Sequence, residues 1–176
     1  MSVEAPRFHY TANATEGAKY QLDLTLKDIA VRLRQEFKQA FPDYRFSVTK
    51  ESYSMGQALT VALMQAPAPV FEVVESSSQE YRQERSVDKG YAQLNHYQLI
   101  RPGWDAERVC NGVKLTETAW QVLKQVVEMV EAYNYDDSDS QQDYFHSNFH
   151  FHLHIGKWNQ PVELKSPGVK ALRYLP

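Results

Sequence analysis

The sequence has little of what secreted, membrane-spanning or disulfide-stabilised proteins carry. Cys110 is the single cysteine among 176 residues, so no internal disulfide can form and the chain suits a reducing compartment. No apolar run approaches the roughly 20 residues that span a bilayer. Residues 1–6 lack the charged and then apolar pattern of a secretory leader. We therefore expect a cytoplasmic protein with no membrane partner.

Recognisable catalytic motifs are also missing. The sequence contains no Ser-His-Asp pattern, no phosphate-binding Gly-rich loop and no dinucleotide-binding fingerprint. Cys110 has no neighbouring histidine, which argues against a catalytic thiol. The acidic loop 136–139 lacks the glycine and the distal glutamate of an EF-hand calcium site. A net charge of -3 argues against a general nucleic-acid coat, although it permits a local basic patch.

What is present predicts one α+β domain over residues 20–164, between a loose arm at 1–19 and a tail at 165–176. Two stretches show helical periodicity, each with an apolar stripe and a polar side. The first runs over 26–41, begins after Thr25 as N-cap and ends at Pro42. The second begins after Thr116 and continues to about residue 133. Its apolar half is wider, so we expect it to be the more buried helix.

Alternation of apolar and polar residues predicts strands at 45–50, 57–64, 91–100 and 146–155. The resulting order is α-β-β-β-α-β. Short strands with helices gathered on one side are typical of an α+β fold, here with a mainly antiparallel four-stranded sheet and two main helices packed on one face. The polar stretch around 66–90 predicts a long loop with at most a short helix.

Residues 146–155 carry the most distinctive pattern. Apolar residues occupy the odd positions from 149 to 155, and four of the six histidines occupy even positions. Because successive side chains of a strand point to opposite faces, one polar face is expected. It would contain His146, Asn148, His150, His152 and His154. We interpret this face as a contact surface for an unidentified protein partner, to which the nearby tyrosines Tyr97, Tyr135 and Tyr144 would contribute.

The same face leaves a metal site open as an alternative. Side chains two residues apart on a strand lie about 6.8 Å apart, so two neighbouring imidazoles can share one zinc ion. His150 and His154 lie about 13 Å apart by the same reckoning, too far to converge with His152 on one ion. Further ligands would have to come from His96, Asp139 or Asp143. This alternative predicts a zinc-binding protein or a metal-dependent enzyme.

A second alternative is a nucleic-acid-binding module that uses the first helix. Lys27, Arg34 and Lys38 fall within about 40° of one another around the helix axis, with no acidic residue between them. Such cations can contact phosphates. The order of elements is similar to that of a double-stranded RNA-binding domain, but that module needs a basic start to its second helix. Here Thr116-Glu117-Thr118 is acidic, which excludes it.

One further pattern covers much of the chain. Residues 30–48 read Ala-Val-Arg-Leu-Arg-Gln-Glu-Phe-Lys-Gln-Ala-Phe-Pro-Asp-Tyr-Arg-Phe-Ser-Val, and Ser52-Tyr53-Ser54-Met55-Gly56 precedes another strand. A helix with spaced basic residues, Phe-Pro, an Arg-Phe-Ser-Val strand and Tyr-Ser-x-Gly resemble the twenty-ninth family of large polyvalent-protein-associated domains. Segments 95–97, 133–139 and 143–155 also resemble it, so the likeness extends over most of 22–160.

This resemblance implies an α+β fold and a particular biological setting. Polyvalent proteins belong to phages and conjugative elements, and they enter recipient cells together with the invading DNA. The resemblance implies no known catalytic residues. We therefore expect a non-enzymatic accessory protein of a phage or mobile element that acts by binding in the cytoplasm of the host or recipient cell. Interference with host defence is the expected consequence.

Overall fold

The computed structural model describes residues 14–72, 89–103, 105–139, 141, 143 and 146–165. Helix α1 (Leu26–Ala40) forms where the sequence predicts it. Thr25 Oγ1 accepts a hydrogen bond from the backbone N–H of Asp28, and the N–H of Phe41 donates to the carbonyl of Phe37. These two bonds satisfy terminal backbone groups that a helix leaves unpaired. Its buried face consists of Leu26, Ile29, Ala30, Leu33 and Phe37.

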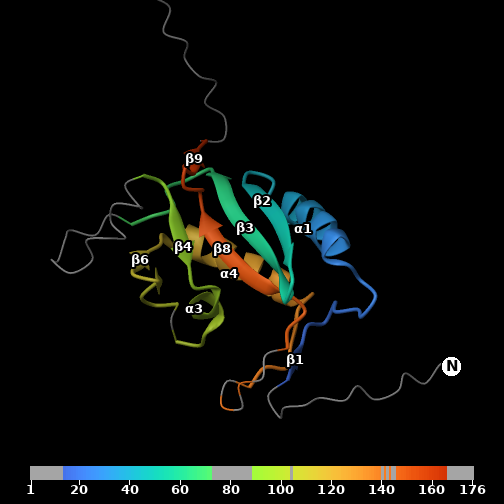
Figure 1. Ribbon diagram of the computed structural model, residues 1–176. Helices are drawn as coiled ribbons and strands as arrows, with labels where there is room; N and C mark the ends of the chain where they lie inside the picture. The colour runs from blue at the N-terminus through green and yellow to red at the C-terminus, as the bar shows by residue number, and fades with distance from the viewer. Residues whose placement is uncertain are drawn as a thin grey trace, which may run out of the picture.

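Helix α4 (Glu117–Glu131) also confirms its prediction. Thr116 is the N-cap: its Oγ1 accepts a hydrogen bond from the N–H of Ala119 and donates one to the carbonyl of Pro69. The N-cap therefore also connects the helix to the segment around Pro69, which follows the strand that ends at Ala66. The buried stripe consists of Ala119, Trp120, Leu123, Val126, Val127 and Val130. Figure 1 shows α4 crossing behind the sheet, with α1 alongside the strand β2 (Arg45–Tyr53).

The main sheet has five strands, and it is mixed. Its path is β2-β3-β8-β4, and a short fifth strand, β9, also pairs with β3. β2 and β3 form an antiparallel hairpin, and β8 is antiparallel to β4 but parallel to β3. The bounds are β2 (Arg45–Tyr53), β3 (Gly56–Ala66), β4 (Ala92–Leu94), β8 (His150–Ile155) and β9 (Glu163–Leu164).

The α+β class is thus confirmed, whereas the mainly antiparallel four-stranded sheet needs correction. Between β3 and β8 the chain passes through β4, which belongs to the same sheet, and then through α4. It enters β8 at the end of the sheet where β3 begins, so the two neighbouring strands run parallel. The alternation within each strand does not encode this direction, because both directions have the same period of two.

The strand predicted at 91–100 is wrong in its second half. Only β4 is extended, and it is followed by α3 (His96–Ile100), a helix of five residues. Asn95 causes the change, because its side chain accepts a hydrogen bond from the N–H of Tyr97. A side chain that bonds to the nearby backbone competes with the strand ladder and favours a helix start.

Four short strands complete the described chain: β1 (Thr15–Glu16) pairs with β7 (Tyr135–Asp136), and β5 (Val109–Cys110) pairs with β6 (Val113–Lys114). The end of the arm expected at 1–19 is therefore attached: the N–H of Gly17 donates to the carbonyl of Asn134 at 2.9 Å. Residues 1–13 of that arm, 73–88 of the expected loop and 166–176 of the expected tail lie outside the described residues.

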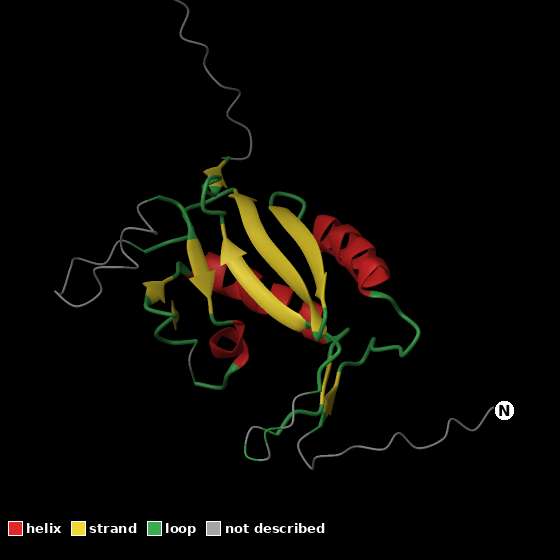
Figure 2. Cartoon of the chain, in the orientation of Figure 1, coloured by secondary structure: helices red, strands yellow, loops and turns green. Residues whose placement is uncertain are grey.

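The core lies between one face of the sheet and the two long helices. Leu59, Val61 and Leu63 of β3, with Leu153 and Ile155 of β8, are fully buried in one cluster with the apolar faces of α1 and α4. The opposite, front face of the sheet carries the intervening residues of the same strands. In Figure 2 both long helices lie behind the sheet or at its side, and neither crosses the front face. The two long helices therefore leave the front face of the sheet uncovered.

Candidate binding surfaces

The front of β8 carries three of the predicted histidines. We call His150, His152 and His154 the histidine face. In the parallel pairing with β3 they lie beside Ala58, Thr60 and Ala62. His150 and His152 are exposed and His154 is half-buried. Because the neighbouring β3 side chains are small, the imidazoles rise above that strand and are reachable from the front.

Aromatic side chains stand at both ends of the histidine face. The ring of Tyr53 stacks on His150 with centroids 6.4 Å apart. At the other end Tyr91 meets His154 edge-on at 5.9 Å, and Trp158 meets Tyr91 edge-on at 6.3 Å. Trp158 is 80% exposed. The sequence pattern did not indicate these three rings; the one available signal was that Tyr53 and Trp158 follow predicted strands closely and Tyr91 begins one.

Two other residues predicted for this surface, His146 and Asn148, lie ahead of β8 and not within it. His146 is exposed but precedes β8, so it is not part of the strand. Asn148 stabilises the local backbone instead, because its Nδ2 donates to the carbonyl of Tyr133 at 3.2 Å and its own carbonyl accepts a bond from Gln57 at 2.8 Å. These bonds bend the chain ahead of β8 and explain why the strand begins at His150 instead of at residue 146.

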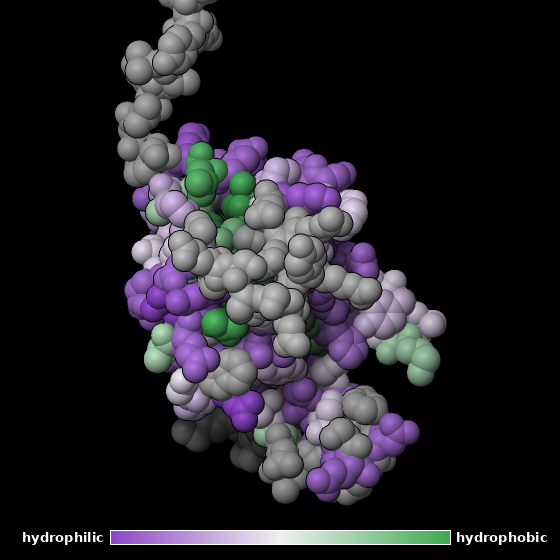
Figure 3. All heavy atoms as spheres, turned by 90° about the vertical axis from the view of Figure 1, so that its left-hand side faces the viewer, coloured by the Kyte–Doolittle hydropathy of each residue, from purple (hydrophilic) through white to green (hydrophobic). Residues whose placement is uncertain are grey.

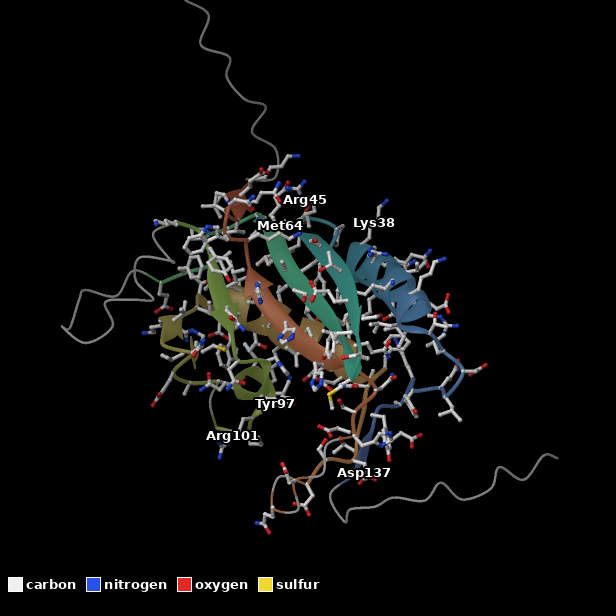
Figure 4. All side chains as sticks on the ribbon, in the orientation of Figure 1. Lys38, Arg45, Met64, Tyr97, Arg101 and Asp137 are labelled. Carbon is white, nitrogen blue, oxygen red and sulfur yellow. The ribbon has the colours of Figure 1, made fainter. Side chains whose placement is uncertain are left out.

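The three predicted tyrosines also separate. Tyr135 is buried, stacks on Tyr20 at 5.3 Å and donates its hydroxyl to Asp137. It therefore cannot take part in a contact surface, and that expectation is wrong. Tyr97 is exposed, but it lies on α3 below β4 (Figure 4). Tyr144 lies outside the described residues.

His96 points toward the interior instead of joining the histidine face. Its ring packs 4.6 Å from Phe151, and its Nε2 lies 3.5 Å from Glu131 Oε1 on α4. Burial, together with the nearby His152, lowers the pKa of His96 to about 4. Burial also raises the pKa of Glu131. Both groups are therefore driven toward their neutral forms although they face each other.

The zinc alternative gains no third ligand from the structure. Within the described ranges no group of three or more His, Cys, Asp or Glu side chains is arranged to hold a metal ion. His96 is directed toward Glu131, and Asp139 accepts a hydrogen bond from the N–H of Gln141 in its own loop. The pairs on β8 that could share a metal are thus the ones already visible in the sequence, His150 with His152 and His152 with His154.

The predicted basic stripe divides into two parts. Arg34 and Lys38 line a cavity of about 420 Å³ together with Arg45, which lies beyond the helix at the start of β2. Lys27 does not line it, because eleven residues of helix place it about 16 Å from Lys38 along the axis. Arg34 also donates from its Nη2 to the carbonyl of Val48 at 2.6 Å. The sequence located two of the three cations, and only the fold brings in Arg45.

No helix in the described part of the chain combines the length and the apolar character that crossing a membrane requires. In the view of Figure 3 the described atoms are mostly hydrophilic, and hydrophobic residues form small separate patches. Single exposed apolar side chains of this kind are ordinary on protein surfaces.

Fold and surface together define an α+β domain with a helix-covered back and a polar, histidine-bearing front. Residues 24–109 match the model of large polyvalent protein associated domain 29, a family of phage and polyvalent proteins to which no function is assigned. The family resemblance is confirmed over this range. β8 and the other later segments lie beyond the matched residues. No curated protein and no solved structure matches the chain.

Proposed function

We propose that this protein is a non-enzymatic accessory protein of a phage or mobile element, and that it binds another protein through its histidine face. One observation carries the proposal: the long helices cover the back of the sheet, while the front presents exposed imidazoles between aromatic rings. Tyrosine and tryptophan side chains combine an apolar body with a polar tip, which suits them to protein interfaces. His150, His152, Tyr53 and Trp158 form the proposed contact.

The family of residues 24–109 supports the setting of this proposal. Proteins of phages and conjugative elements act in the cell that receives the DNA. We place the binding event in the cytoplasm of that host or recipient cell, with interference with host defence as its consequence. The partner would then be a host protein with a surface complementary to the aromatic-flanked imidazoles.

Photocrosslinking in the recipient cell tests the proposed surface. A photoreactive phenylalanine analogue replaces His152 in one version of the full chain and Gln35 in the matched control. Gln35 is exposed on α1, away from the front of the sheet. We expect a discrete adduct after illumination from position 152 and none from position 35. Equal adducts from both positions, or none from position 152, would contradict the proposal.

The metal-dependent alternative makes a separate prediction. It requires the purified protein to retain zinc in stoichiometric amount and to lose it in His152→Ala. Protein that carries no zinc and still forms the adduct from position 152 would support binding and contradict the metal alternative.

A further inference from the structure

A second surface lies where α1 ends and β2 begins, away from the histidine face. Its centre is the cavity of about 420 Å³ lined by Arg34, Lys38 and Arg45. This volume is in the range of about 300–1,000 Å³ that small-molecule sites occupy. Lys38 and Arg45 lie at the same end of the domain in Figure 4. The cavity is therefore large enough for a ligand and is bordered by three cations.

Acidic groups balance the charge around this cavity only in part. None of the residues that line it is acidic. Lys38 forms no ion pair with an acidic group in the part of the chain that the structure describes. Arg45 lies 3.4 Å from Glu163, but both side chains are more than half exposed. An exposed pair at that distance is weak and is readily exchanged for a stronger anion.

A hydrogen bond to the backbone of β2 holds the side chain of Arg34 in place. One of its N–H groups donates to the carbonyl of Val48 on β2, and an arginine has five such donors. The guanidinium is thus positioned at the cavity with donors left for a ligand. Lys38 alone could be explained by its place in the last turn of α1, where a cation complements the helix dipole. That explanation does not extend to Arg45, which belongs to a strand.

Aromatic rings form the wall beside these cations. Tyr44 and Phe46 have ring centroids 6.4 Å apart and planes within 17° of parallel. Phe37 supports Phe46 from α1 at 5.2 Å. A planar base can stack on such rings, and guanidinium and ammonium groups bind phosphate. Gln65 lines the same cavity and offers an amide that can hydrogen-bond to the edge of a base.

We infer that this cavity binds a nucleotide unit, with its phosphate on Arg34, Lys38 and Arg45 and its base against Tyr44 and Phe46. The unit can be a free nucleotide or part of a strand. Arg45 favours the strand, because it also lines a neighbouring cavity of about 490 Å³ that is bordered by Lys157 and by Glu163, the exposed carboxylate that a phosphate would displace from Arg45. A chain of phosphates leaving the first cavity past Arg45 would meet this fourth cation.

Fluorescence anisotropy with the full-length protein tests this inference. The probes are labelled 12-nucleotide single strands of DNA and RNA, and the competitors are AMP, inorganic phosphate and dextran sulfate. The test variant is Lys38→Gln/Arg45→Gln. The matched control is Lys27→Gln/Lys50→Gln, which removes the same charge from exposed residues that do not line the cavity. Tyr44→Leu removes the ring, and Tyr44→Phe keeps it.

We expect the test variant to bind at least tenfold more weakly and to reduce the slope of log K against log salt by about 1.4, since each phosphate contact to a single strand contributes about 0.7. Tyr44→Leu should lower affinity about tenfold, and Tyr44→Phe should restore it. If AMP displaces the strand with an affinity equal to that of the strand itself, the ligand is a free nucleotide. If the strand binds far more tightly than AMP does, the ligand is nucleic acid. Either result supports the inference.

Three results would overturn it. The first is no binding of any probe at low salt. The second is an equal loss of affinity in the test and control variants. The third is displacement by dextran sulfate together with indifference to Tyr44→Leu, which would show general attraction to polyanions without a base site. Circular dichroism confirms that each variant is folded before its binding is compared.

Discussion

Replacing the buried His96 by phenylalanine should remove much of the loss of stability that acid causes in this protein. The pKa of His96 is lowered from 6.5 to about 4 in the fold, chiefly by burial. Between these values the unfolded chain binds a proton that the folded chain does not. The free energy of unfolding must therefore fall as the pH falls from about 7 toward 4, and rise again on return.

The two pKa values set the size of this effect. A shift from 6.5 to about 4 corresponds to about 3 kcal/mol once the pH is below both values. Between pH 8 and pH 5 the same linkage amounts to about 2 kcal/mol. His96 is only 8% exposed, so solvent screening reduces this estimate little. The raised pKa of Glu131 acts in the opposite direction, because that carboxyl keeps its proton better in the fold.

Urea unfolding at pH 8 and pH 5 measures the effect. Wild type should lose about 2 kcal/mol more than His96→Phe between these two conditions. The comparison concerns the pH dependence, so a general destabilisation by the substitution does not disturb it. His150→Gln, an exposed histidine of the front face, serves as the control and should behave as wild type does. If wild type and His96→Phe lose the same free energy, His96 titrates normally and the reasoning about its burial fails.

Three further predictions concern stability and are measured by thermal or urea unfolding. Leu153→Ala should cost about 2–5 kcal/mol, because the side chain is fully buried in the core; a loss below 1 kcal/mol would show that the central strand is loosely packed. Thr116→Ala should cost about 1 kcal/mol through loss of the α4 cap, whereas an unchanged Tm would contradict the capping role. Gly156→Ala should cost clearly more than Gly103→Ala, since both have positive φ but only a Cβ at position 156 would meet a backbone oxygen, 2.3 Å away; equal costs would show that backbone strain alone matters.

The helices could be predicted from sequence because their signals are local. Thr25 and Thr116 each bond to an N–H three residues ahead, and the apolar stripes repeat within one turn. The same holds for the alternation in β8. Asn95 could have been recognised as a cap as well, but the apolar residues around it made a strand look equally good. Local patterns thus predicted elements well where one signal dominated.

The arrangement of the surfaces depended on contacts between distant residues. Tyr53, Tyr91 and Trp158 reach the histidine face from three separate parts of the chain. Arg45 joins Arg34 only because β2 turns back along α1 after Pro42. Asn148 looked like a member of the polar face, but its side chain donates to the backbone carbonyl of Tyr133 and its backbone carbonyl accepts a bond from Gln57. No periodicity within a single segment carries that information.

The place of β8 between β3 and β4 has a consequence for how this molecule is made. A ribosome releases both flanking strands well before the one that joins them, so the nascent sheet stays divided until residue 155 is free. Its halves then expose unsatisfied backbone edges, which readily pair with the wrong chain. For this reason, fragments that stop at residue 109, where the family match ends, should aggregate instead of folding.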